Sequence, residues 1–184
     1  EAYFFRGWAY FQLVQLYGGV PIRLKSLSVD PTANMARSSV ADVYKQIIAD
    51  FKNAESNLLP AKDPKAGEPG RVTRGVAKGF LAKTYMTMAS GAATGNVSVR
   101  GGTDNGMYTY AKTVVAGLEN ISSKDYYTLA RDKALEVIAS NEYSLFTNWT
   151  DLWNKAGRNK TEHMWELQAL GGTTFVNELH NYMS

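Results

Sequence analysis

Two histidines and two glutamates near the C-terminal end of the sequence are the residues whose types could support metal binding or acid–base catalysis. His163 and His180 are far apart, with no His-Glu-x-x-His motif or set of carboxylates between them, so they do not predict a metal site. Glu162 and Glu166 are close enough to form a catalytic pair, with one as the acid of a glycosidase. Carboxylates at this spacing are more commonly solvated or ion-paired. The sequence also lacks a Gly-x-Ser-x-Gly motif and a phosphate-binding loop, so we expect no catalytic residue, no metal and no cofactor, and keep a glycosidase only as a third hypothesis.

The segment GGTDNGMY, residues 101–108, has the oxygen-bearing side chains of a calcium loop. Asp104 and Asn105 could supply ligands along a backbone that glycine allows to bend. The other acidic residues of such a loop are missing, and Asp-Asn-Gly is also a common turn sequence. A simple turn is the favoured interpretation, and calcium binding is left open.

Aromatic residues are abundant: 11 tyrosines, 7 phenylalanines and 4 tryptophans make up 12% of the chain. A flat ring with a polar edge packs on the C–H face of a sugar, but the same rings also fill protein cores. Rings at helical spacing are predicted to be core residues. The candidate ligand-binding residues are those that lie outside the helical patterns. They are Tyr108, Tyr110, Asn177, His180, Asn181 and Tyr182.

The elements that must position these residues are mainly helices. The first, in FFRGWAYFQLVQLYGGVP at 4–21, is apolar around most of its circumference and is predicted to pack on several sides. Arg6 lies among the apolar residues, so its guanidinium needs carbonyls or a carboxylate, and its predicted role is structural. Trp8 is expected to contact another helix rather than a partner. Gly18 and Gly19 end the helix.

Three further long helices follow. A capping box of Ser39 and Asp42 opens the second, which carries one apolar stripe and ends before Pro60. The third begins after Thr73 and extends to about residue 88, and the fourth covers about 126–140, followed by a shorter helix at 148–155. The residues expected to face inward on the fourth helix are Leu129, Ala130, Ala134, Val137 and Ile138.

Between these helices lie a Pro/Gly loop at 60–72 and a glycine-rich insertion at about 91–125, which is typical of functional or mobile segments. Strand signals are sparse, with alternation only over 164–167. The sequence predicts an all-α fold of helix pairs at about 1–59 and 73–146, in a single helical domain at 1–184. Spacing within the pairs is similar to that of tetratricopeptide repeats, although periodicity alone leaves an ordinary bundle open.

Composition excludes several functional classes. The net charge of +3 comes from 20 basic and 17 acidic residues spread along 184 positions, so there is no basic footprint for nucleic acid or a membrane surface. Cysteine is absent, which rules out disulfides and thiolate chemistry within the chain. The sequence begins at Glu1 in helical pattern, and we expect it to be a fragment of a longer protein.

Five segments, in order, closely resemble the SusD/RagB family of outer-membrane nutrient-binding lipoproteins: EAYFFRGWAYFQLVQLYGGVP, RSSVADVYKQIIADFKNAESNLLP, GRVTRGVAKGFLAKTYM, ARDKALEVIASNEYSLF and EHMWELQ. The resemblance implies tetratricopeptide-like helix pairs whose irregular insertions carry the ligand site. Arg6 matches the arginine of the family's "LRA" segment, although GWAY then departs from the family pattern. The family's lipid-bearing cysteine, first helix pair and ligand-rich C-terminal part have no counterpart in this chain, so site residues are not transferred.

The function that this resemblance implies is non-catalytic binding of an oligosaccharide at the cell surface. The protein would be attached to the outer membrane through an N-terminal lipid anchor outside this chain, and would act as a lid on a SusC-like TonB-dependent transporter. Some family members pass on a peptide instead of a glycan. The alternative hypothesis is a tetratricopeptide-type adaptor that binds a protein or peptide in a helical groove.

Overall fold

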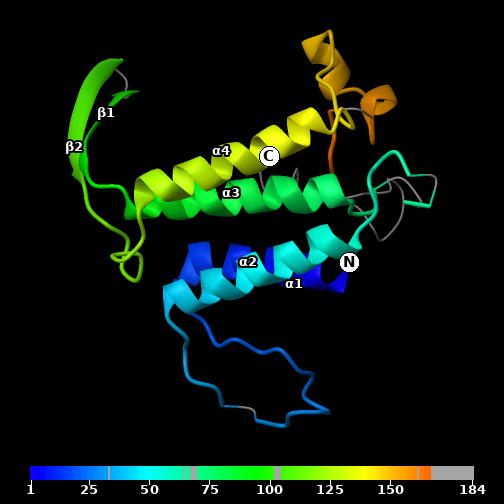
Figure 1. Cartoon of the computed structure of the whole chain (residues 1–184). Coiled ribbons are helices and arrows are strands. Elements are labelled where there is room, and N and C mark those ends of the chain that lie inside the picture. Colours follow the sequence, from blue (N-terminus) through cyan, green and yellow to red (C-terminus); the bar gives the residue numbers. More distant parts are fainter. Residues whose placement is uncertain (33, 64, 67–69, 102–104, 161, 167–184) are drawn as a thin grey trace, which may run out of the picture.

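The computed structural model describes residues 1–184 except 33, 64, 67–69, 102–104, 161 and 167–184 (Figure 1). Its four long helices are α1 (Ala2–Tyr17), α2 (Val40–Asn57), α3 (Arg74–Ala92) and α4 (Ser123–Ala139). The strands β1 (Gly95–Gly101) and β2 (Gly106–Lys112) form a hairpin, and two 3₁₀ turns, η1 (Trp149–Leu152) and η2 (Lys155–Gly157), follow α4. The predicted, mainly α-helical class is confirmed. None of the helices in these ranges is long and apolar enough to cross a bilayer.

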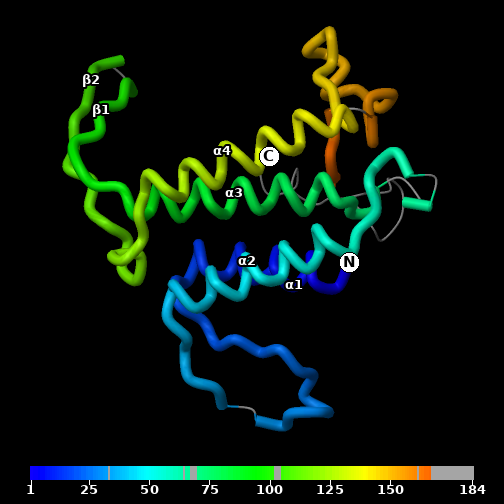
Figure 2. The backbone as a smooth tube through the Cα atoms, in the orientation of Figure 1, coloured from blue at the N-terminus to red at the C-terminus, as the bar shows by residue number. Residues whose placement is uncertain are grey.

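The helices form the two expected pairs. α1 packs on α2 and α3 packs on α4, while α2 joins the two pairs by lying against α3. Successive helices run in opposite directions, so the long connection at 18–39 leaves from one end of the first pair, as the tube in Figure 2 shows. The hairpin also extends from the body, beyond the end of α3. The tertiary framework is therefore helical, and its irregular segments project from the ends of helices.

Local sequence signals account for the helix boundaries. The Ser39 hydroxyl accepts the Asp42 N–H and so caps α2, as predicted. Ser122 caps α4 in the same way through the N–H of Asp125. α1 ends at Gly18, whose φ of 70° lies in the left-handed region that glycine tolerates.

The core lies where α1, α2 and α3 meet. Fully buried side chains include Phe4, Phe51 and Leu81, and the indole of Trp165 closes this cluster from the C-terminal segment. Trp165 makes edge contacts with Phe4 at 5.5 Å and with Trp8 at 5.9 Å between ring centroids. Trp8 thus packs within the protein, against the core cluster and Trp165. Edge-to-face packing of this kind adds about 0.5–1.5 kcal/mol per pair beyond the burial of apolar area.

Arg6 joins α1 to α2. Its Nε and Nη2 donate to Asp50 Oδ2 and Oδ1 at 2.8 and 2.7 Å, and the Asp50 side chain is 0% exposed. Gln46 Nε2 donates to the same carboxylate at 3.1 Å. Gly7 lets the helices approach, since a Cβ there would lie 3.1 Å from the Phe51 ring. The carboxylate raises the pKa of Arg6 through its hydrogen bonds, which favours the charged guanidinium.

Two predictions about buried faces were wrong. α1 is not packed on several sides: its buried residues follow one face, whereas Phe5, Leu16 and Tyr17 are exposed. On α4 only Ala130 is buried, and Leu129, Ala134 and Ile138 are exposed rather than inward.

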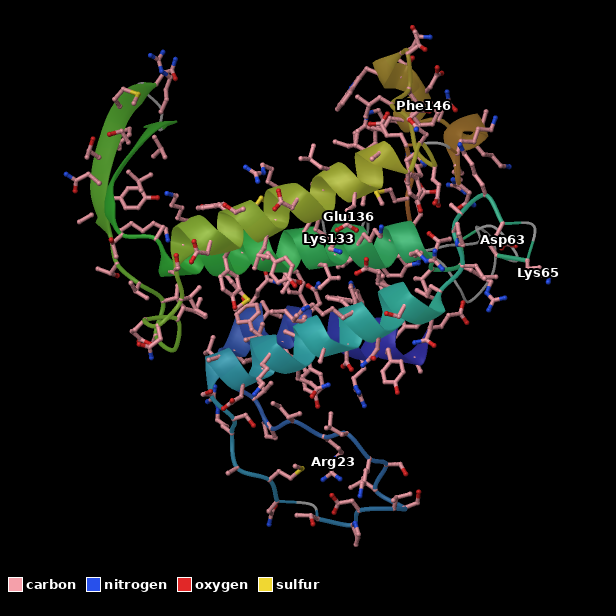
Figure 3. The ribbon with its side chains drawn as sticks, in the orientation of Figure 1. Arg23, Asp63, Lys65, Lys133, Glu136 and Phe146 are labelled. Carbon is pink, nitrogen blue, oxygen red and sulfur yellow. The ribbon has the colours of Figure 1, made fainter. Side chains whose placement is uncertain are left out.

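The physical reason for the shifted face of α4 is an ion-pair network at its seam. Lys133 Nζ lies 3.0 Å from Glu55 Oε1 on α2 and 2.9 Å from Glu136 Oε1, and Lys78 Nζ of α3 lies 2.9 Å from Glu136 Oε2 (Figure 3). Lys133 therefore lies on the inward face of α4, although the apolar pattern in the sequence predicted other residues on that face.

The insertion at 91–125 contains regular structure that the sequence analysis did not predict. β1 and β2 pair antiparallel, with Val97 opposite Tyr110 and Val99 opposite Tyr108. By contrast, residues 164–166 form no strand, and Leu167 lies outside the described residues. The expected helix at 148–155 is instead the two turns η1 and η2.

Candidate functional site

The two predicted ligand-binding tyrosines in the insertion lie together on β2. Tyr108 and Tyr110 alternate with Thr109, so they share one face of the hairpin, opposite Val99 and Val97 of β1. Their side chains are 48% and 52% exposed, and the hairpin stands away from the helices in Figure 1. The structure therefore presents two neighbouring rings to solvent.

Contacts at the base and on the opposite face hold this hairpin. Lys112 Nζ donates to the carbonyls of Ser90 and Ala93 at the end of α3. The hydroxyls of Ser98 and Thr109 form a hydrogen bond of 2.7 Å across the strands. Successive same-face residues of a strand are about 6.8 Å apart, so the two tyrosine rings are neighbours on this face of the hairpin. This arrangement suits stacking and hydrogen bonding, and includes no reacting group.

The other four predicted ligand-binding residues, Asn177, His180, Asn181 and Tyr182, lie outside the described residues. So does Asp104 of the candidate calcium loop. Its neighbour Asn105 has a φ of 52°, a conformation typical of asparagine in a turn. Within the described ranges, no group of three or more histidine, aspartate and glutamate side chains is placed to hold a metal.

Glu162 and Glu166, the candidate acid–base pair, both accept backbone hydrogen bonds. Glu162 Oε2 accepts the N–H of Phe146 at 2.7 Å, and Glu166 Oε2 accepts the N–H of Asn159 at 2.9 Å. Glu166 Oε1 also lies 2.9 Å from Nδ1 of His163, although these two atoms are not aligned for a hydrogen bond. Glu162 fastens the segment after α4 to the segment that carries Trp165, and Glu166 makes its contact within the latter segment. Their contacts support structural roles.

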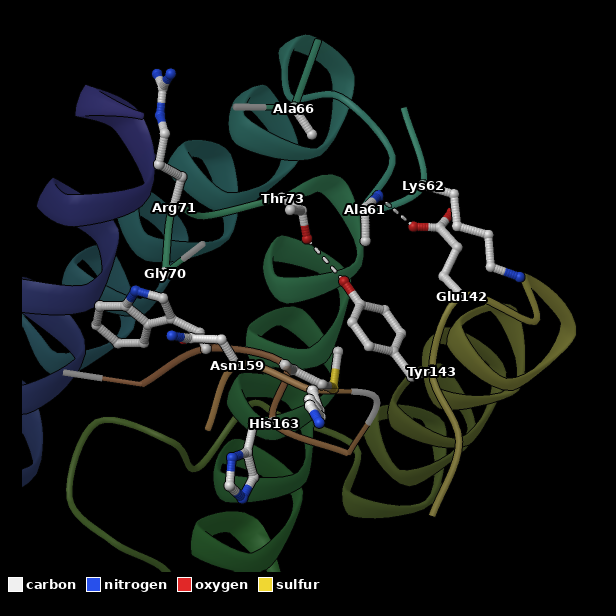
Figure 4. Close-up of a pocket in the computed structure, with 13 residues that line it drawn as sticks. Ala61, Lys62, Ala66, Gly70, Arg71, Thr73, Glu142, Tyr143, Asn159 and His163 are labelled. Carbon is white, nitrogen blue, oxygen red and sulfur yellow. Dashed lines mark hydrogen bonds between the residues drawn. The ribbon is translucent and has the colours of Figure 1, made fainter. Parts of the chain in front are cut away.

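A cavity that the sequence analysis did not identify lies at the opposite end of α3 from the hairpin (Figure 4). Its volume is about 450 Å³, within the range of small-molecule pockets. Three segments form it: the loop between α2 and α3, the residues just after α4, and the segment before Trp165. No single sequence motif could have revealed a cavity assembled in this way.

Tyr143 forms one wall of the cavity. Its hydroxyl lies 2.7 Å from Thr73 Oγ1, and burial raises the pKa of Tyr143 while the Thr73 hydrogen bond opposes that change. A Cβ at Gly75 would lie 2.4 Å from this ring, so glycine is required at that point of α3. Beside it, the Glu142 carboxylate accepts the Ala61 N–H and joins the two loops. The cavity is thus bounded by fixed side chains.

Comparison with known proteins finds similarity to one family. Residues 1–86 match a SusD-like family model described as starch-binding and associating with the outer membrane. A SusD-like protein of Bacteroides ovatus is 28% identical over 172 residues, which cover 91% of this chain and 25% of that protein. The SusD-like protein P38 of Formosa agariphila is 39% identical over 59 residues, or 32% of this chain and 12% of that protein.

Solved structures agree with these sequence matches. A crystal structure with xylogluco-oligosaccharide has a TM-score of 0.67 and 25% identity, covering 95% of this chain and 30% of the other. A SusD superfamily protein of Bacteroides fragilis has a TM-score of 0.65 and 20% identity, covering 94% and 30%. Together, the family-model match, the SusD-like relatives and these structures support a SusD/RagB family protein.

The SusD-like family-model match covers α1, α2 and most of α3. The hairpin with Tyr108 and Tyr110 and two of the three segments around the cavity lie beyond it. The chain also spans only about a quarter of the length of its Bacteroides ovatus relative. The matched region is the helical framework, and the candidate binding groups are on segments joined to it.

Proposed function

We propose that the whole protein is a non-catalytic, cell-surface glycan-binding component of a TonB-dependent nutrient uptake system. The observation that carries this proposal is the likeness of 95% of the chain to a structure that was crystallised with xylogluco-oligosaccharide. The family description, starch-binding and associating with the outer membrane, supports the same class of ligand and the same location. Residues 1–184 would then be one helical part of a longer SusD-like protein.

The proposed mechanism is binding without bond cleavage. The helices hold the hairpin at its base, and Tyr108 and Tyr110 stack on the C–H faces of consecutive sugar units while their hydroxyls form hydrogen bonds. Glu162 and Glu166 keep their backbone partners and take no part in hydrolysis. A rigid platform reduces the ordering cost of binding, which suits a protein that captures a ligand and releases it unchanged.

The proposed partner is a SusC-like TonB-dependent transporter, to which the protein passes the oligosaccharide. Attachment to the outer membrane would be through a lipid on a cysteine of the longer protein, since this chain contains none. We expect the transporter to purify with the full-length protein from detergent-solubilised outer membranes. Replacement of the lipid-bearing cysteine should release the protein from the membrane fraction, and unchanged membrane attachment would contradict this mode of anchoring.

Calorimetric titration of the full-length protein tests the binding proposal. Soluble starch, xyloglucan and their oligosaccharides are the glycans to titrate, and the products are analysed for cleavage. We expect binding without hydrolysis, and an affinity about tenfold lower in the Tyr108→Ala/Tyr110→Ala variant, corresponding to loss of about 1.4 kcal/mol of stacking. Met107→Ala is the matched control, because Met107 is exposed on the opposite face of the same strand. Hydrolysis, or binding of peptides and of none of these glycans, would contradict the proposal.

A further inference from the structure

Two tryptophans on the turn after α4 are largely exposed. Trp149 is 73% exposed and Trp153 is 71% exposed, and their ring centroids lie 5.7 Å apart with an interplanar angle of 66°. Tryptophan is highly buried on average, so a pair at this exposure needs an explanation. Exposed aromatic groups of this size commonly mark a binding surface.

The turn that carries the pair is held by side-chain hydrogen bonds. The Asp151 carboxylate accepts Nδ2 of Asn154 at 3.1 Å and Nδ2 of Asn148 at 3.4 Å. Asn154 Oδ1 in turn accepts the N–H of Gly157 at 2.9 Å. A Cβ at Gly157 would lie 2.0 Å from the Asp151 carbonyl oxygen, so η1 and η2 are in close contact. The two indoles are therefore placed by a braced turn rather than by a free loop.

The surroundings of the indoles favour a sugar over an apolar protein surface. Asn148, Thr150 and Asn154 are exposed beside them. The fully buried centre of a protein interface is depleted in charged residues and surrounds each ring with apolar groups. Here the rings lie among two amides, a hydroxyl and a carboxylate, with the partly buried Leu152 as the one apolar residue between them in the sequence. Each amide keeps an N–H that Asp151 does not occupy. This pattern matches an oligosaccharide, in which C–H faces alternate with hydroxyl groups.

We propose that Trp149 and Trp153 form a second glycan-contacting platform, which we name the tryptophan platform. The inference rests on the proposed function, and it adds a site at the far end of α4 from the tyrosine hairpin (Figure 1). The 17 residues of α4 span about 26 Å at 1.5 Å per residue. A short oligosaccharide reaches one platform only, whereas a polysaccharide engages both. Simultaneous contacts raise the overall affinity for the longer chain.

Titration of the full-length protein with polysaccharide tests the platform. Xyloglucan and soluble starch are used, with the wild type, Trp149→Ala/Trp153→Ala and Trp149→Tyr/Trp153→Tyr compared by calorimetry. We expect the alanine variant to lose about tenfold in affinity and the tyrosine variant to lose less, because a phenol ring retains part of the stacking face. Leu145→Ala is the matched control: Leu145 is apolar and 82% exposed, but offers no ring.

The possible outcomes distinguish failure of the tryptophan platform from failure of the proposed function on which it rests. Equal affinities of wild type and alanine variant for a bound polysaccharide would overturn the platform and leave the proposed function standing. Absence of binding by the wild type to either polysaccharide or its oligosaccharides would count against both. An equal loss in the Leu145→Ala control would show that general apolar contact, rather than ring stacking, accounts for the effect, and would also overturn the inference.

Discussion

Removal of Arg6 and removal of Asp50 from their ion pair should lower the free energy of unfolding by different amounts. Asp50 is 0% exposed, whereas the Arg6 side chain is 30% exposed and also reaches the Leu24 carbonyl. Arg6→Leu strands a fully buried carboxylate with one amide donor from Gln46, and should cost about 3–5 kcal/mol of unfolding free energy. Asp50→Leu leaves a guanidinium that can turn to water, so we expect a smaller loss of about 1–3 kcal/mol.

A double-mutant cycle in the full-length protein measures this difference. Urea unfolding followed by circular dichroism, with hydrogen exchange of α1 and α2 amides, reports the affected region. The double variant Arg6→Leu/Asp50→Leu should be more stable than Arg6→Leu alone, because neither charge is left without its partner. Arg131→Leu is the control: its pair with Asp132 is exposed, so a change within about 0.5 kcal/mol is expected. A larger loss for Asp50→Leu than for Arg6→Leu, or additive losses, would refute the reasoning.

Two further predictions concern α3 and the seam of α4. Gly75→Ala places a Cβ against the Tyr143 ring and should lower stability by about 1–3 kcal/mol in thermal unfolding. Gly79→Ala should be neutral or stabilising, because its Cβ would meet the flexible Met164 side chain, 3.4 Å from the methyl carbon and 3.9 Å from the sulfur. Equal losses in the two variants would contradict a clash at Gly75. Hydrogen bonds from Lys133 and Lys78 lower the pKa of Glu136 in the folded protein. The contribution of Glu136 to the free energy of unfolding is therefore complete above the ordinary pKa of 4.5, and it is lost as pH falls through the lowered pKa of the folded protein. The melting temperatures of wild type and Glu136→Gln should therefore converge as pH falls below 4.5, and a constant difference down to strongly acidic pH would contradict this.

The sequence predicted best those features that depend on neighbouring residues. The cap at Ser39 and the apolar stripe of α2 are local patterns, and the structure reproduces both. The inward face of α4 was predicted wrongly because a non-local contact decides it: Lys133 pairs with Glu55 from another helix. The cavity beside Tyr143 could not be predicted at all, since it depends on where three separate segments converge.

The hairpin was missed although its signals are present in the sequence. NVSVR and MYTYA both alternate, with β-branched or aromatic residues at every second position, around an Asp-Asn-Gly turn. The glycines at both ends of the hairpin favoured an irregular loop over a pair of strands. Both faces of the hairpin are largely exposed, so its alternation does not follow the usual pattern of one apolar and one polar face. The tyrosines were nevertheless singled out, because they lie outside the helical patterns.

The criterion of aromatic residues outside the helical patterns would also have selected the tryptophan platform, if the secondary structure of that segment had been predicted correctly. Trp149 and Trp153 have the spacing of successive helical turns and fall within the predicted helix at 148–155, so neither was singled out as a candidate ligand contact. In the structure, 3₁₀ turns replace that helix, and both rings face solvent. An error in element type thus became an error in site assignment, because an aromatic residue counts as core or as ligand contact according to the element that carries it. Assigning irregular segments correctly therefore matters more for locating binding groups in this chain than assigning its helices.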